Sequence, residues 1–299
     1  MTDLVIIGTV ALDNVETPFG KVENALGGSA TFASYAASFF HPSGIVSVIG
    51  KDFPSEHKST LEKKNISLLG VSVEEKTFKW EGFYEYDMNE AKTLKTELNA
   101  LETFKPKIPE EYQNAKYIFL ANIDPDVQLT LLQYAKDPTL VMMDTMNFWI
   151  EHKKESVMEV IKKTDVILLN DGEARLMFNT PNLVKAAKEL LNMGPKAVII
   201  KKGEHGALLF TNDHHFNAPG YPLEQVKDPT GCGDSFGGAL IGYLAKTKNH
   251  DQKNLRKAMV YASTIASFNA EDFSLERMKK LSMEEIEKRY QEFVELRNF

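Results

Sequence analysis

The sequence of 299 residues has a single cysteine, Cys232, which excludes an intrachain disulfide and is typical of a reducing compartment. Basic residues are in the minority, with 35 Lys and Arg against 42 Asp and Glu, and the net charge of -7 argues against a nucleic-acid partner. No apolar run approaches the roughly 20 residues of a membrane span. Residues 1–3 lack the basic start of a signal peptide. We therefore expect a cytoplasmic protein without nucleic-acid or membrane partners.

Apolar residues make up 43% of the chain and charged residues 26%, which is ordinary for a globular enzyme. Short apolar runs, typical of buried strands, alternate with helical segments along most of the chain. We expect strands at residues 4–8, 45–49, 117–121, 140–143, 166–169 and 197–200, and helices at residues 31–40, 54–65, 127–135, 151–163, 183–192 and 254–269. This order predicts the α/β fold class, with a mostly parallel central sheet, helices on both faces and ligands at the carboxyl ends of the strands.

Two stretches break this alternation. Residues 10–26 resemble a loop with Pro18 and Gly20, and residues 77–86 alternate as an antiparallel strand does. We interpret both as a small β-strand appendage, and the pattern fits a lid and a surface hairpin equally well. The division that follows places residues 1–10, 27–70 and 99–299 in a main α/β domain that binds nucleotide and substrate, and residues 11–26 and 71–98 in the small β lid.

The densest chemical signal is DPTGCGDSFGG at residues 228–238. Gly231 and Gly233 permit a tight turn, and a helix is expected to begin at about Gly233. Free N–H groups and the positive end of the helix dipole then make an anion site suited to phosphate. Asp234 in the first turn can contact a ligand there, although a helix-capping acid explains it equally well. A dinucleotide-binding turn is disfavoured, because such a turn follows an apolar strand at the start of a βαβ unit.

Cys232 lies within the same turn. A thiol at a helix N-terminus can have a lowered pKa and act as a nucleophile. No histidine partner can be placed from the sequence, so we favour a small residue that fits a crowded turn.

Three further segments accompany residues 228–234. LGGSA lies at residues 26–30, NDGE at residues 170–173 just after an expected strand, and KGEHGA at residues 202–207. In order and spacing the four segments resemble the double glycine, the Asn-x-x-Glu motif, the nucleotide-side turn and the C-terminal signature of the ribokinase (PfkB-type) family of sugar and nucleoside kinases. The resemblance spans nearly the whole chain.

The resemblance implies ATP-dependent phosphorylation of a hydroxyl on a sugar-like or nucleoside substrate. Asp234 would be the general base, and the N–H groups of Gly231, Cys232 and Gly233 would form the anion hole for the transferring phosphoryl group. Glu173 would hold Mg²⁺ through water, since Mg²⁺ dehydrates reluctantly. The other implied nucleotide-side residues are Asn170, Lys202, Gly203, Glu204, Gly206 and Val226. Taken alone, Asn170 and Glu173 also fit a helix N-terminus with favourable acids.

A monovalent cation is a further hypothesis. In relatives, the residues corresponding to Asp228 and Thr230 help to form a site for a cation such as K⁺. The segment that would complete the site, residues 267–271, departs from the commonest pattern of the family.

The substrate side is implied near the first strand. Asp13 would accept hydrogen bonds from substrate hydroxyls, with Asn14 as a weaker contact, and ordinary loop polarity is the alternative for both. Gly27 and Gly28 would let the backbone approach the substrate. Many relatives carry an asparagine where this chain has Phe32, an exchange that permits a less polar or aromatic-bearing substrate such as a nucleoside. Further candidates just beyond strand ends are Asn122, Asp144 and Asn147.

The expected lid strand alternates aromatic residues, and one of its faces could cover the substrate or form a homodimer contact. These residues are Trp80, Phe83, Tyr84 and Tyr86. The leading hypothesis is an ATP-dependent kinase. A catalytically silent sugar- or nucleotide-binding sensor of the same fold is the alternative, disfavoured by the retention of Asp234 and Glu173. A nicotinamide-dependent oxidoreductase is disfavoured by the position of the glycine pattern.

Overall fold

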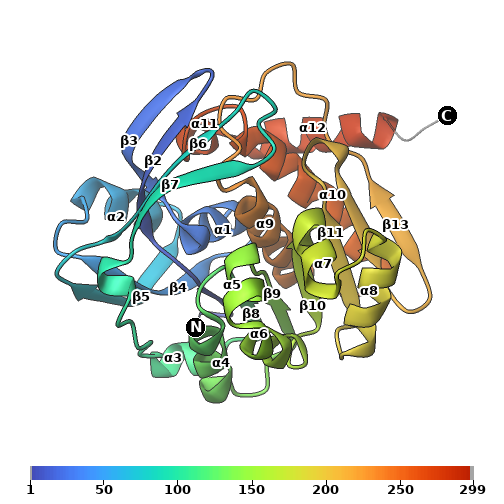
Figure 1. The fold of residues 1–299 in the computed structure, drawn as a ribbon, viewed down its shortest axis with the longest axis horizontal. Coiled ribbons are helices and arrows are strands. Elements are labelled where there is room, and N and C mark those ends of the chain that lie inside the picture. Colours follow the sequence, from blue (N-terminus) through green and yellow to red (C-terminus); the bar gives the residue numbers. More distant parts are fainter. Residues whose placement is uncertain (1, 297–299) are drawn as a thin grey trace.

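The computed structural model describes residues 2–296, whose strands form a nine-stranded and a four-stranded sheet (Figure 1). The large sheet has the order β13-β12-β11-β10-β9-β8-β1-β4-β5. Its parallel strands are β1 (Leu4–Ile7), β4 (Ser43–Gly50), β5 (Ile66–Glu74), β8 (Tyr117–Leu120), β9 (Leu140–Met143), β10 (Val166–Asn170) and β11 (Ala197–Lys201). An antiparallel hairpin that we did not expect extends one edge, formed by β12 (Ala207–Phe210) and β13 (His215–Ala218).

Helices cover both faces of this sheet, because parallel neighbours need crossover connections. One face packs against α1 (Ser29–Ala37), α2 (Ser55–Glu62), α9 (Cys232–Thr247), α10 (Gln252–Asn269), α11 (Glu276–Lys280) and α12 (Met283–Glu295). The other packs against α3 (Glu110–Gln113), α4 (Pro125–Tyr134), α5 (Asn147–His152), α6 (Lys154–Ile161), α7 (Asp171–Phe178) and α8 (Leu183–Asn192). Each face has its own apolar cluster, so the central strands are buried on both sides. The predicted fold class is confirmed.

The expected helix at residues 151–163 is wrong in its bounds. The segment divides into α5 and α6 at Lys153, whose backbone is not helical. The Nζ atom of Lys153 donates hydrogen bonds to both carboxylate oxygens of Asp124, at 2.9 and 2.7 Å. Among the helices of residues 2–296, none is long and apolar enough to cross a membrane.

The small sheet has the order β3-β2-β6-β7, from β2 (Ala11–Thr17), β3 (Gly20–Gly27), β6 (Phe78–Tyr84) and β7 (Ala91–Glu97). Two pairs are antiparallel hairpins, but β2 and β6 pair in parallel, because the chain passes through β4 and β5 of the large sheet between them. The expected lid boundary is also corrected: residues 71–74 belong to β5, which stays paired with β4 as far as Glu74.

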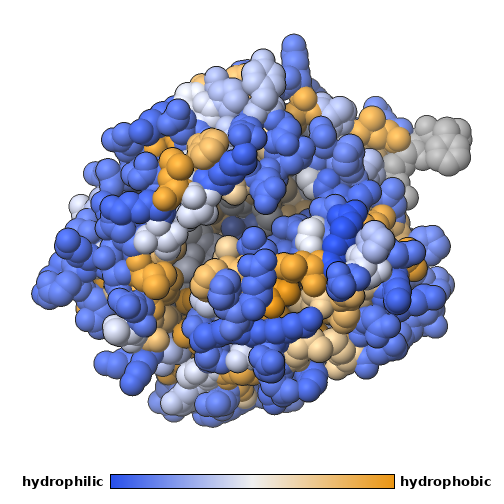
Figure 2. All heavy atoms as spheres, in the orientation of Figure 1, coloured by the Kyte–Doolittle hydropathy of each residue, from blue (hydrophilic) through white to orange (hydrophobic). Residues whose placement is uncertain are grey.

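The small sheet stands beside the carboxyl ends of the parallel strands, where ligands bind in open α/β sheets. Figure 2 shows this face of the molecule hollowed near its centre, between the small sheet and helices α5 and α7. The signature residues 228–238 lead into α9 behind the same region (Figure 1). The fold therefore brings the two halves of the predicted site together.

Candidate active site

The signature segment turns sharply into α9 at Gly231. This residue has a φ of +74°, and a Cβ there would come within 2.3 Å of the ring of Phe32. Backbone conformation and space therefore both require glycine. α9 begins at Cys232, one residue earlier than expected, with the turn packed directly on Phe32.

The expected anion hole needs free N–H groups at this helix start, and the structure provides some of them. Within residues 2–296, the N–H groups of Gly231 and Gly233 have no hydrogen-bond partner. The N–H of Cys232 donates to the carbonyl oxygen of Pro229 at 3.1 Å, because residues 229–232 form a turn. The expectation that Cys232 contributes its N–H is therefore corrected, and the two glycines supply the free donors.

Two buried polar side chains hold the signature turn in place. Asn269 at the end of α10 donates to the carbonyl oxygen of Thr230 at 2.8 Å. Asp228 accepts from the N–H groups of Thr230 at 2.9 Å and Ser274 at 3.3 Å. Sequence reasoning missed Asn269, although a fully buried amide on an apolar-faced helix is the signal that could have identified it.

The thiol of Cys232 has no nucleophilic character. Burial raises its pKa to about 12, and its Sγ lies 3.5 Å from the carbonyl oxygen of Ala266. A thiol with a raised pKa stays protonated at neutral pH. The structure supports the interpretation of Cys232 as a small residue in a crowded turn.

Asp234 lies in the first turn of α9, beside the free glycine N–H groups. Burial and then the nearby carboxylate of Asp144 raise its pKa to about 7, against the opposing effect of Lys201. The N-cap residue, Gly231, has no side-chain cap, and a hydrogen bond from the backbone N–H of Asp234 itself opposes the rise in the pKa of its carboxyl group. A carboxyl group with a pKa near neutrality can exchange a proton with a ligand at physiological pH.

Asn170 and Glu173 form a capping box at the start of α7. Glu173 accepts from the backbone N–H of Asn170 at 2.7 Å and from its side-chain amide at 2.8 Å, and Asn170 accepts from the N–H of Glu173 at 2.8 Å. Burial, with Asp144 as the next contributor, raises the pKa of Glu173 to about 8. The helix-start interpretation is thus confirmed for both residues, and the Glu173 carboxyl is also one of a group of buried acids.

A buried ion pair completes this group. Lys201 at the end of β11 pairs with Asp144, which follows β9, and their side chains are 17% and 4% exposed. A Cβ at Gly233 would lie 3.2 Å from Nζ of Lys201, so the ammonium group is at the helix start. We expected Asp144 to line the cleft, but we missed Lys201. A charged residue directly after the apolar run 197–200 is the signal that could have identified it.

The expected nucleotide turn connects β11 to β12. Gly206 has a φ of +80°, and a Cβ there would lie 2.1 Å from the carbonyl oxygen of Ala218. Gly203, Glu204 and His205 are exposed in a 3₁₀ turn (Gly203–His205), while Lys202 is half-buried. Val226 is also half-buried and lies in the loop before the signature segment. This loop contacts the end of α10, because the N–H of Lys227 donates to the carbonyl oxygen of Ala270.

Asp13 lies on β2, against the double glycine. A Cβ at Gly27 would lie 1.9 Å from Oδ2 of Asp13, and one at Gly28, where φ is +96°, would lie 2.5 Å from the carbonyl oxygen of Thr9. Burial first, and then Asp228 and Asp234, raise the pKa of Asp13 to about 8, while the N–H of Gly28 opposes the rise. Asp13 and Asp234 are therefore close enough to interact electrostatically.

The small sheet contributes Tyr84 to this site. Its hydroxyl lies 3.2 Å from Oγ1 of Thr230, and burial raises its pKa. A small hollow remains between β2, β3 and the signature turn, with the lining residues Asp13, Val15, Val22, Ala25, Leu26, Phe32, Asp228, Thr230 and Ser274. Of the other lid aromatics, Tyr86 lies beyond the end of β6 and is 90% exposed, so it takes no part in this space.

Three predicted polar contacts have local partners. Asn14 accepts from the N–H of Asn24 at 2.7 Å, on the opposite face of β2 from Asp13. Asn122 accepts from the indole N–H of Trp149 at 3.0 Å. Asn147 accepts from the N–H of Phe148 at 2.9 Å, at the start of α5.

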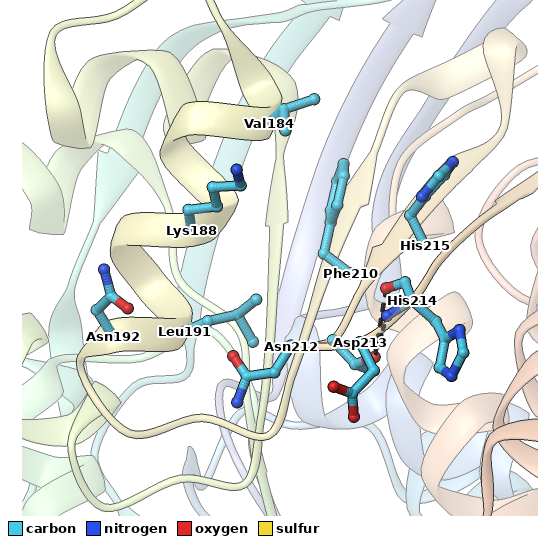
Figure 3. A pocket seen from close by; sticks show the side chains of 10 residues that line it. Val184, Lys188, Leu191, Asn192, Phe210, Asn212, Asp213, His214 and His215 are labelled. Atoms are coloured by element: carbon cyan, nitrogen blue, oxygen red, sulfur yellow. Dashed lines mark hydrogen bonds between the residues drawn. The ribbon is translucent and has the colours of Figure 1, made fainter.

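A wider hollow lies away from these residues (Figure 3). It is formed by α8 and the β12–β13 turn, with side chains such as Lys188, His214 and His215. Since β12 runs antiparallel to β11, this turn is at the opposite edge of the sheet from Lys201. It is separate from the acids and the anion hole.

Comparison with known proteins identifies the family of this chain. The family model described as pfkB family carbohydrate kinase matches residues 1–279. The chain is 31% identical over 250 residues to a cytidine kinase of Thermococcus kodakarensis, covering 81% of this chain and 89% of that one.

Solved structures share the fold. The nucleoside kinase of Methanocaldococcus jannaschii superposes with a TM-score of 0.78 at 22% identity, over 97% of this chain and 98% of that one. An E. coli ribokinase II in complex with ATP and Mg²⁺ superposes with a TM-score of 0.76 at 19% identity, over 98% of this chain and 100% of that one. The chain therefore belongs to the pfkB family of carbohydrate kinases, and it is a kinase of the ribokinase fold.

Proposed function

We propose that this enzyme transfers the γ-phosphoryl group of ATP to a hydroxyl of a nucleoside. The observation that carries the proposal is the position of the buried Asp234, in the first turn of α9 beside the free glycine N–H groups and close enough to Asp13 to act on it electrostatically. The cytidine kinase of T. kodakarensis and the nucleoside kinase of M. jannaschii support a nucleoside acceptor. The solved complex of the E. coli relative supports ATP and Mg²⁺ as the donor and its metal.

The proposed reaction is an in-line displacement. Asp234 accepts the proton of the substrate hydroxyl as its oxygen bonds to the γ-phosphorus, and the bond from that phosphorus to the β–γ bridging oxygen breaks to release ADP. A positioned base contributes about 10²–10⁴-fold to such a rate. The N–H groups of Gly231 and Gly233 and the dipole of α9 stabilise the negative charge of the transferring group.

Two buried carboxyl groups fit a water-bridged Mg²⁺. Asp144 and Glu173 are 3% and 7% exposed, and Asp144 contributes to the raised pKa of Glu173, so a bound cation would favour the ionised form of both. Within residues 2–296, no cluster of three or more His, Cys, Asp or Glu side chains forms a complete metal cage. Mg²⁺ commonly takes one or two carboxylates together with substrate phosphates. When bound, it would neutralise charge on the phosphates.

On the acceptor side, Asp13 holds the substrate. Its carboxylate accepts hydrogen bonds from sugar hydroxyls, and Gly27 and Gly28 leave the space for them. The ring of Phe32 packs against Gly231, so we assign it to the support of the proposed anion hole and not to the sugar contact that asparagine makes in many relatives. Residues 11–27 and 78–97 would form a lid, and Tyr84 would join it to the signature turn and exclude water.

Potassium activation and dimer formation through the lid stay predictions. Asp228 already accepts two backbone N–H groups, and the carbonyl of Thr230 accepts Asn269, so these atoms have protein partners. Equal rates in K⁺ and in a large organic cation would contradict potassium activation. A monomeric mass in solution would contradict the dimer.

The proposal is tested by ADP release with ATP and Mg²⁺ over nucleosides, pentoses, hexoses and their phosphates. We expect the highest kcat/KM with a nucleoside and no release above background from Asp234→Asn. A sugar as the best acceptor would contradict the nucleoside assignment. Binding of nucleotide without ADP release from any acceptor would favour the sensor.

A further inference from the structure

We propose that Lys201 is a catalytic residue whose ammonium group donates hydrogen bonds to the phosphoryl group in transfer, while Asp144 holds it in position. The inference rests on the proposed function and adds a buried ammonium group to the start of α9, where the sequence motifs supplied acids and N–H groups. It is carried by the contacts, burial and charges around Nζ.

The first step is the position of the ammonium group. Lys201 is the last residue of β11, and its Nζ is 3.2 Å from the place that a Cβ on Gly233 would occupy. Gly233 supplies one of the free N–H groups at the start of α9. A phosphoryl group that binds those N–H groups would therefore lie within reach of Nζ.

The second step is the number of free donors. A lysine ammonium group has three N–H donors. Within residues 2–296, Nζ of Lys201 has one recorded acceptor, Oδ2 of Asp144. Two donors are left at a side chain that is only 17% exposed, and buried donors without partners are costly. An anionic ligand at the helix start would satisfy them.

The third step is charge. Asp144, Glu173 and Asp234 all act electrostatically on Lys201. A phosphate that enters here approaches these acids, and direct contact with the ammonium group offsets the repulsion from those that are ionised. Phosphoryl transfer depends on charge neutralisation and positioning, and a lysine serves this purpose in other phosphoryl-transfer enzymes. Asp144 bonds Lys201 and thereby fixes the direction of the remaining donors.

The test is a comparison of nucleotide binding. We expect Lys201→Met to weaken the binding of the non-hydrolysable analogue AMP-PNP about 10- to 100-fold more than that of ADP, since a charge-assisted bond to the terminal phosphate is lost. Lys201→Arg keeps the charge and should retain most of the preference for the triphosphate. Turnover should fall in Lys201→Met, with the KM of the nucleoside within about twofold.

The matched control is Lys196→Met, which makes the same change just before the other end of β11, at a side chain that is 81% exposed. It should leave both affinities unchanged. If Lys201→Met does not fold, Lys201→Gln, which removes the charge but keeps a polar partner for Asp144, takes the same measurement.

The outcomes separate the two proposals. Equal weakening of AMP-PNP and ADP, or unchanged affinity for both, would overturn the role of Lys201 while wild-type ADP release leaves the kinase proposal standing. A wild-type protein that binds neither nucleotide would overturn both.

Discussion

Two Lys–Asp ion pairs, one at each end of strand β11, differ sharply in their exposure to solvent. At the carboxyl edge, Lys201 pairs with Asp144, and the two side chains are 17% and 4% exposed. At the amino edge, Lys196 pairs with Asp165 at 2.8 Å, and the lysine is 81% exposed. Lys196 directly precedes strand β11, and Lys201 is its last residue. A solvated pair contributes about 0–1 kcal/mol, whereas breaking a buried pair costs about 3–5 kcal/mol. Of these two ion pairs, the one that is shielded from water lies at the carboxyl end of the strand, where the ligand is expected.

The largest effect should come from breaking the buried pair. Asp144→Asn removes the charged hydrogen-bond partner of the buried Lys201 ammonium group, so we expect the free energy of unfolding to fall by about 3–5 kcal/mol. Asp165→Asn at the amino edge should cost about 1 kcal/mol or less. Urea unfolding measures both. Equal losses for the two variants would remove the distinction between the edges.

The buried acids should make the ligand-free protein less stable as the pH rises. The folded-state pKa values of Asp13, Glu173 and Asp234 are raised to about 8, 8 and 7, above their ordinary values near 4. Between pH 4 and 8 the folded state therefore holds more protons than the unfolded state, and stability falls with rising pH.

Thermal unfolding between pH 5 and 9 measures this effect. Asp13→Asn should flatten the decline, because one of the three titrating groups is removed. A melting temperature that rises over the same range would contradict the burial of these acids.

A smaller effect is expected where the small sheet meets the signature turn. Tyr84→Phe removes the hydroxyl that lies 3.2 Å from Oγ1 of Thr230, which should cost about 0.5–1.5 kcal/mol. We expect the KM of the acceptor to rise a few-fold at nearly constant kcat, since lid closure is weakened and the chemistry is not. Steady-state kinetics will show it, with the exposed Tyr86→Phe as the matched control. A selective fall in kcat would instead place Tyr84 in the chemical step.

Local sequence determined much of the fold. The capping box of Ser282 and Glu285 at the start of α12 could be predicted from four adjacent residues, and the helix at residues 183–192 from its apolar period. The free glycine N–H groups at the start of α9 were predictable because the glycines and the helix start are contiguous. Each of these features depends on interactions within a few residues.

The features that sequence missed depend on distant contacts. Lys201 and Asp144 are 57 residues apart, and nothing in either segment indicates their pairing. The parallel pairing of β2 with β6 depends on the path of the chain through β4 and β5 between them. The N–H of Cys232 is not available to a ligand because it donates to the carbonyl oxygen of Pro229, in a turn whose geometry depends on Asn269 and Asp228.

Asp234 as the proton acceptor is the central claim, and one pair of measurements on Asp234→Asn tests it most directly. With the preferred nucleoside and saturating ATP and Mg²⁺, we expect kcat to fall about 10²–10⁴-fold while the dissociation constant of ATP stays within about threefold. A variant that turns over at the wild-type rate, or that loses ATP binding together with activity, would contradict the assignment of Asp234 as the base.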